Sequence, residues 1–150
     1  MITTEQIKAL REETGLSIMQ CRQALEEAAG DKTKALEILK AKGASIASKK
    51  SDRALGSGVV SSYIHAGDSV GAMLELLCET DFVAKNPEFR STARDIAMHI
   101  AAMKPADVGE LLGQPYIKGG GETIGDLING TIQKFGERTE IGEFIRYSIN

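Results

Sequence analysis

The sequence is poor in the residues around which small chemical sites are most often built. It has no tryptophan, two cysteines and two histidines among 150 residues. Cys21 and Cys78 lie far apart among apolar neighbours and lack a CxxC spacing, so we expect buried thiols in a reducing compartment. His65 and His99 have no cysteine or carboxylate at ligand spacing, which indicates surface or packing roles. The pattern predicts neither a metal site nor a disulfide framework.

Long apolar runs and an excess of positive charge are missing as well. The most apolar run, residues 70–78, is interrupted by Glu75 and is too short to cross a bilayer. The chain starts directly with a helix-start pattern, so we expect no signal peptide and a cytoplasmic location. The net charge is −3, whereas phosphate contacts need clustered lysine and arginine. We therefore expect no membrane contact and no direct nucleic-acid contact.

Residues 1–43 instead carry three short amphipathic helix patterns. Thr3 with Gln6 and Ser17 with Gln20 form capping boxes, which mark the starts of the first two helices. Apolar residues recur at helical spacing, and the expected buried positions are Ile7, Leu10, Ile18, Cys21, Leu25, Ala28, Ala35, Leu36 and Leu39. Three such helices joined by tight turns predict a compact unit with a small core.

The pattern changes at Gly43, which is expected to end the third helix. Residues 44–57 are small, polar and basic, which predicts a helical or partly ordered linker. Residues 58–64 and 70–80 are then rich in β-branched and apolar residues, and a Gly-Asp turn signal separates them. Two strands joined by a short turn predict an antiparallel hairpin.

Two helices and a third strand follow the hairpin. Asn86 with Pro87 starts a helix that Pro105 closes, and Thr123 caps the next helix. The expected buried positions of these helices are Phe89, Ala93, Ile96, Ala97, Ile100, Met103, Ile124, Leu127, Ile128, Ile132 and Phe135. Residues 140–149 alternate apolar and polar, which predicts a strand.

The predicted fold class is α+β. A three-helix domain (1–43) and a linker (44–57) precede an α+β core domain (58–150), in which a three-stranded antiparallel sheet in the order β-β-α-α-β carries helices on one side.

The segment between the second strand and the following helix is the one candidate site that the pattern yields. Residues 80–85 place Asp81 beside Phe82 in a connection held at both ends, which suits a binding element. A structural role is the alternative, because Phe82 continues the even-numbered phase of the strand and would close the core. No glycine-rich segment has the spacing of a phosphate-binding or dinucleotide-binding loop, so no cofactor is predicted.

Two long motifs resemble the signatures of the elongation factor Ts family. Residues 7–15 with 18–25 match the first signature, and residues 78–86 match the second. Residues 114–117 and 141–147 also resemble family segments. The resemblance covers nearly the whole chain in the right order, and two independent motifs make it specific.

The resemblance implies a guanine nucleotide exchange factor for elongation factor Tu, and not an enzyme. Its amino-terminal domain would resemble the ubiquitin-associated fold and dock on Tu through Arg11, Ile18 and Met19. By the same match, the element pushed into Tu near its magnesium site comprises Thr80, Asp81, Phe82 and Val83. Binding there would weaken GDP binding, so that GTP can enter.

The chain departs from the family pattern after Pro105. Short bacterial members carry a sizeable helical segment between the long helix and residues 114–117, and here only a few residues intervene, so the chain is a reduced form. This departure leaves a homodimer open. The alternatives are a ubiquitin-associated-type binding module with an unrelated α+β domain, an enzyme that uses Glu75, Glu79 or Asp81, and an RNA-binding protein that uses residues 40–53.

Overall fold

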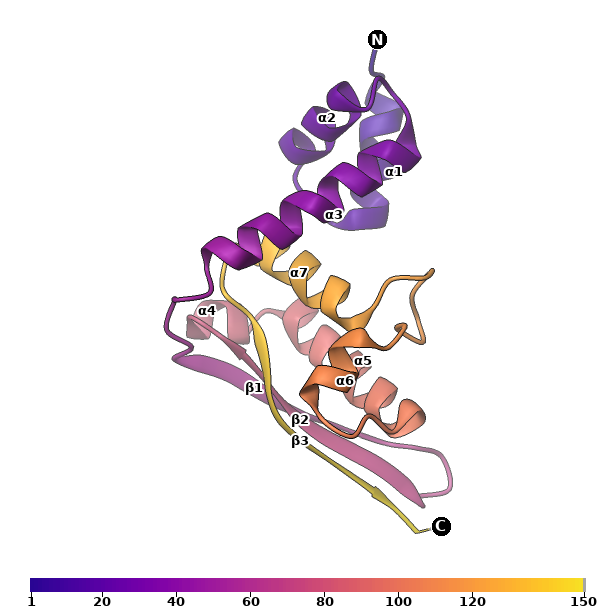
Figure 1. The fold of residues 1–150 in the computed structure, drawn as a ribbon, viewed down its shortest axis with the longest axis vertical. Helices are drawn as coiled ribbons and strands as arrows, with labels where there is room; N and C mark the ends of the chain where they lie inside the picture. The colour runs from indigo at the N-terminus through magenta and orange to yellow at the C-terminus, as the bar shows by residue number, and fades with distance from the viewer. Residues whose placement is uncertain (150) are drawn as a thin grey trace.

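A computed structural model describes residues 1–149 and shows an α+β architecture in two parts (Figure 1). A three-helix unit at the amino terminus stands above a three-stranded sheet that carries helices on one face. The elements, in chain order, are α1 (Thr4–Thr14), α2 (Ile18–Glu27), α3 (Lys32–Lys49), β1 (Ser57–Ile64), β2 (Val70–Cys78), α4 (Asp81–Ala84), α5 (Pro87–Met103), α6 (Val108–Gly113), α7 (Ile124–Phe135) and β3 (Glu140–Ser148). The fold class predicted from the sequence is confirmed.

Local capping explains why the first two helices begin where they do. The Thr3 and Ser17 side chains each accept a hydrogen bond from the third helical backbone N–H. In turn, the Gln6 and Gln20 side-chain oxygens accept from the backbone N–H groups of Thr3 and Ser17. The buried faces meet in a small separate core that contains Leu10, Cys21, Leu25 and Leu39, among others. Ile18 is an exception, because it is 52% exposed and the prediction of a buried position there is wrong.

Helix α3 does not end at Gly43, contrary to the prediction. It continues to Lys49, so residues 44–49 of the predicted linker are helical. A Cβ atom on Gly43 would lie 2.8 Å from the Gln133 side chain and 3.4 Å from the Asn129 carbonyl oxygen, both on α7. A side chain at position 43 would have to displace the end of Gln133, so the glycine matches the close approach of α7 and not a helix end.

The strands form one antiparallel sheet in the order β1-β2-β3. Its inner face packs on α5, and α7 contributes to the same core, whose fully buried residues include Leu74, Leu76, Phe89, Ile96, Ile100 and Ile124. Free thiols at Cys21 and Cys78 are buried, as predicted. Met103 is half-exposed at the end of α5, so its expected burial is wrong.

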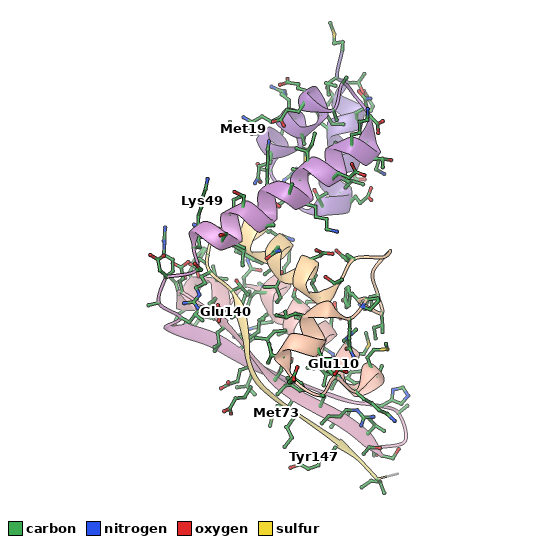
Figure 2. All side chains as sticks on the ribbon, in the orientation of Figure 1. Met19, Lys49, Met73, Glu110, Glu140 and Tyr147 are labelled. Atoms are coloured by element: carbon green, nitrogen blue, oxygen red, sulfur yellow. The ribbon has the colours of Figure 1, made fainter. Side chains whose placement is uncertain are left out.

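A β-bulge divides strand β3 between the two faces of the sheet. Ile141 pairs with Leu76 and Phe144 with Leu74, so two residues of β3 stand opposite Glu75. The alternating residues of β3 therefore do not share one face. Ile141 is buried against the helices, whereas Tyr147 is 69% exposed on the outer face, where Met73 also points away from the helices (Figure 2).

His99 fastens the short connection that follows α5. Its ring is fully buried, with Nε2 2.9 Å from the Gln114 Oε1 atom, and its Nδ1 atom accepts a bond from the Ile117 backbone N–H at 3.3 Å. The Gln114 amide donates in turn to the Met103 carbonyl oxygen. Burial lowers the pKa of His99, which favours the neutral ring that this pattern requires. The packing role predicted for His99 is confirmed.

Candidate functional site

The 80–83 segment lies at the end of β2, where the chain leaves the sheet. Thr80 caps the four-residue helix α4, and its hydroxyl oxygen accepts a bond from the Val83 backbone N–H at 3.4 Å. Val83 and Ala84 are buried and anchor α4 to the core, whereas Phe82 is 86% exposed. The alternative in which Phe82 closes the core is excluded by this exposure. An exposed aromatic ring on a helix that is anchored by buried neighbours is typical of binding surfaces.

Glu137, in the connection between α7 and β3, holds the start of this segment. Its Oε1 atom accepts bonds from the backbone N–H groups of Glu79 at 3.1 Å and Thr80 at 3.0 Å. Its Oε2 atom accepts the Thr80 hydroxyl proton at 2.7 Å. The strand ladder ends at Cys78, so these N–H groups have left the sheet and the carboxylate takes the place of a strand partner.

A second carboxylate completes the link in the opposite direction. Glu79 accepts a bond from the Arg138 backbone N–H, and its other oxygen lies 3.4 Å from the Arg53 guanidinium. The Arg138 guanidinium donates to the Arg53 carbonyl oxygen and to Glu140. The connection after α7 and the end of β2 therefore hold each other by reciprocal hydrogen bonds.

Two further groups fix the segment from the sheet side. The Ser57 hydroxyl donates to the Asp81 carboxylate, which ties the first residue of α4 to the first residue of β1. The buried Cys78 thiol donates to the Thr80 carbonyl oxygen at 3.3 Å. Burial, followed by the charge of Glu137, raises the pKa of this thiol and keeps it protonated. The ring of Phe82, in contrast, is exposed to solvent.

The carboxylates proposed for an enzyme do not converge on a pocket. Asp81 is exposed beside Phe82, Glu79 is engaged by Arg138 and Arg53, and Glu75 accepts a bond from the Glu143 backbone N–H. Acid–base catalysis needs a carboxylate within reach of a bound substrate in a concave site. The geometry therefore gives no support to the enzyme alternative.

The three residues expected to face a partner from the amino-terminal unit lie at its surface. Met19 is 70% exposed near the start of α2, where Figure 2 shows its side chain at the edge of the unit. Ile18, its neighbour, is also exposed, and Arg11 is exposed on α1. The structure therefore presents two separate apolar projections, one at residues 18–19 and one at Phe82.

A cleft of about 720 Å³ lies between the amino-terminal unit and the core, and neither projection lines it. Lys40 of α3 lies 3.2 Å from Asp126 of α7 across the cleft, and Lys134 pairs with Glu88 within the core. Glu122 lines it too, and burial together with the charge of Asp126 raises the pKa of its carboxyl group. This cleft is a seam between the two parts of the molecule.

Sequence reasoning found residues 80–83 but missed the residues that hold them. Glu137 and Ser57 are far from Thr80 and Asp81 along the chain, so no local spacing connects them. The one local sign is that Glu137 follows Gly136, whose left-handed φ of 74° ends α7. Within residues 1–149, no cluster of three or more potential metal ligands is present. No helix in that range is both long and apolar enough to cross a membrane.

Comparison with known proteins finds a similarity that includes this site. The family model described as "Elongation factor TS" matches residues 79–150, which include the 80–83 segment and Glu137. Elongation factor Ts of Carboxydothermus hydrogenoformans is 41% identical, with 99% of this chain and 89% of the relative aligned. The proteins of that name from Thermodesulfovibrio yellowstonii and Rubrobacter xylanophilus are 39% and 38% identical, over 96% and 97% of their lengths.

The alignments also measure how short this chain is. The Carboxydothermus alignment extends over 194 residues, whereas this chain has 150, so at least 44 aligned positions have no counterpart here. The chain is a reduced form of its relatives, as the sequence predicted. The likeness nevertheless spans nearly the whole of both chains and includes the segment that presents Phe82. This chain therefore belongs to the elongation factor Ts family.

Proposed function

We propose that this protein is a guanine nucleotide exchange factor for elongation factor Tu in translation elongation. The observation that carries the proposal is the exposure of Phe82 on a short helix whose backbone is fixed by Glu137, Ser57 and a buried Val83. Exposing a phenyl ring to water costs free energy that a partner recovers by covering it. Thr80, Asp81, Phe82 and Val83 together form the proposed contact with the nucleotide domain of Tu.

The mechanism acts on the ion that holds GDP in Tu. Backbone N–H groups and Mg²⁺ in Tu neutralise the phosphates of GDP. Phe82 enters between packed elements of Tu and displaces them by a small distance, with Asp81 beside it. Magnesium coordination is then lost, and the phosphates lose their main countercharge. Coupling between the two sites is reciprocal, so GDP weakens the binding of this protein by the same factor.

The amino-terminal unit supplies the docking contact in this proposal. Met19, Ile18 and Arg11 bind the nucleotide domain of Tu and hold it while Phe82 acts. The protein itself makes and breaks no covalent bond, so it is not an enzyme, and the excess of GTP in the cytoplasm sets the direction of exchange. It requires no cofactor or metal of its own, and no direct contact with nucleic acid or membrane.

A homodimer is a separate part of the proposal. The outer face of the sheet exposes a group of apolar side chains: Val60, Ile64, Met73, Ile145 and Tyr147. Contiguous exposed apolar side chains are typical of protein interfaces. We propose that a second copy of the chain covers this face, which light scattering after gel filtration would test. A monomer at all concentrations would contradict the dimer and leave the exchange function untouched.

The direct test is release of fluorescent GDP from cognate Tu, with and without this protein. We expect acceleration at catalytic amounts. The variant with Asp81→Ala and Phe82→Ala should lose it while remaining folded. A matched control changes one exposed acid and one half-exposed apolar residue elsewhere, Glu110→Ala with Met103→Ala, and should retain it.

Two results would contradict the proposal. Absence of acceleration by the wild-type protein would show that the reduced chain has lost the activity. A ubiquitin-associated-type binding module would then be favoured, and binding of another partner through residues 1–43 would support it. Equal activity of the double variant and the control would place the exchange contact elsewhere on the surface.

A further inference from the structure

We propose that Glu137 is a positioning residue for nucleotide exchange, because its carboxylate holds the backbone of the 80–83 segment and so fixes where Phe82 points. This inference rests on the proposed function. Glu137 itself is half-buried beneath the segment, and each oxygen of its carboxylate is already engaged by Glu79 or Thr80. It therefore acts through Phe82 and not by touching a partner.

Helix α4 cannot hold its own position. It has four residues, so it forms a single turn, and the first turn of a helix is the unfavourable step in helix formation. Phe82 adds no packing, because its ring is exposed. The position of α4 thus depends on buried Val83 and Ala84, on the bond from Ser57 to Asp81, and on the capped Thr80 at its start.

The Thr80 cap depends in turn on Glu137. The Thr80 hydroxyl donates its proton to Glu137 Oε2, which leaves the oxygen lone pairs free to accept from the Val83 backbone N–H. The same carboxylate accepts the N–H groups of Glu79 and Thr80. Bonds to a charged acceptor are stronger than neutral ones. One side chain therefore determines the backbone direction from which α4 starts.

Glu137 is itself held in a rigid connection. Gly136 ends α7 in the left-handed conformation, and its N–H bonds to the Ile132 carbonyl oxygen. The Thr139 side chain is buried and donates to the Glu137 carbonyl oxygen at 3.2 Å, while the Arg138 N–H is taken by Glu79. The carboxylate is a fixed point on the core, to which the 80–83 segment is attached.

Removal of this carboxylate should lower the fraction of molecules in which Phe82 is correctly placed. The apparent activity of a protein falls in proportion to that fraction. Loss of the three hydrogen bonds is expected to slow GDP release at saturating protein about tenfold. The half-saturating concentration should change little, because Met19, Ile18 and Arg11 lie on the separate amino-terminal unit.

The first experiment needs no partner. Amide hydrogen exchange of the full chain is compared for wild type, Glu137→Ala and the control Glu143→Ala, which removes an exposed carboxylate from β3. In Glu137→Ala, the amides of Glu79, Thr80 and Val83 should exchange about five- to tenfold faster, and amides in α5 should be unchanged. Unchanged exchange at these three amides would overturn the inference, whether or not the protein acts on Tu.

The second experiment measures GDP release from Tu in a double-mutant cycle. If Glu137 acts through Phe82, then Glu137→Ala should slow release in the wild-type background and have no further effect in Phe82→Ala. Glu137→Gln keeps one carbonyl oxygen as acceptor and should recover part of the rate. Full additivity of the two substitutions, or wild-type release by a Glu137→Ala protein that has lost the amide protection, would overturn the positioning role.

Discussion

Met19 and Phe82 both present an apolar side chain to solvent, one from the amino-terminal unit and one from the core. Met19 lies on a ten-residue helix whose start is capped by residues close in sequence, Ser17 and Gln20. Phe82 stands on a four-residue helix whose cap is held by Glu137, 57 residues away from Thr80. The exposed side chain is thus supported by neighbouring residues in one region and by a residue distant in sequence in the other. The first projection should survive loss of the core, and the second should not.

The largest expected effect comes from Phe82→Ala. Truncation of a central aromatic contact typically costs about 2–4 kcal/mol of binding free energy, so we expect GDP release to slow about a hundredfold. The free energy of unfolding, measured by urea denaturation, should change by less than about 0.5 kcal/mol because the ring is exposed. The half-exposed Met103→Ala serves as control. If Phe82→Ala lowered the free energy of unfolding by more than about 2 kcal/mol, the ring would be packed in the core and the contact role would be contradicted.

Met19→Ala should have a smaller effect of a different kind. We expect the half-saturating concentration in GDP release to rise about tenfold, equivalent to about 1.4 kcal/mol, with the maximal rate unchanged. Thr33→Ala, an exposed neutral position on α3, is the control. If the maximal rate fell instead, Met19 would take part in the exchange step and the division between docking and displacement would fail.

Mild acid should lower the stability of the core but not that of the amino-terminal helices. Burial lowers the pKa of His99 below its unfolded value, so the unfolded chain binds a proton more readily than the folded core. Stability is therefore full above the unfolded pKa of about 6.5 and falls as the pH drops toward the folded pKa, by at most about 1.4 kcal/mol per pH unit. Urea denaturation between pH 7.5 and 5.5 should show this slope, and His99→Gln should reduce it. The amino-terminal helices contain no histidine and should not share it.

The smallest effect is expected from Ser17→Ala, which removes the local cap beneath Met19. Loss of such a cap costs about 1 kcal/mol. Hydrogen exchange should accelerate in α2 alone, with the 80–83 segment unaffected. Ser45→Ala, exposed within α3 and without a capping role, is the control. Faster exchange at α4 in Ser17→Ala would show that the two projections are coupled.

The elements that were predicted correctly are those with local determinants. Capping boxes at Thr3 and Ser17 set the first helices, and a turn between two apolar runs set the hairpin. Two helices were not predicted, α4 and α6, so four helices and not two stand between β2 and β3. Helices of four and six residues are too short to show a periodicity, and Phe82 continues the phase of β2 after that strand has ended. The pattern indicated residues 80–85 as a binding segment, whereas Arg11, Ile18 and Met19 were named through the resemblance to a family alone.

The errors share a cause, which is packing between segments distant in sequence. Gly43 resembles a helix stop, yet the helix continues, and α7 lies so close that a larger residue would have to displace the Gln133 side chain. Ile18 has the spacing of a buried residue, but the three-helix core ends below it. The bulge opposite Glu75 changes the face of β3. None of these contacts has a signal in the residues on either side.

Helix α3 is continuous from the amino-terminal unit to the core, which affects the distance between the two projections. Eighteen helical residues span about 27 Å, and α3 packs against α7 through Gly43 and the ion pair of Lys40 with Asp126. The parts that carry the two projections are therefore connected by a continuous helix and not by a flexible linker. Once one projection has bound, the other is presented at a high effective concentration to a surface of matching spacing. In the proposed exchange reaction, a partner surface with another spacing would gain nothing from the second contact, so the length of α3 would restrict which partners bind tightly.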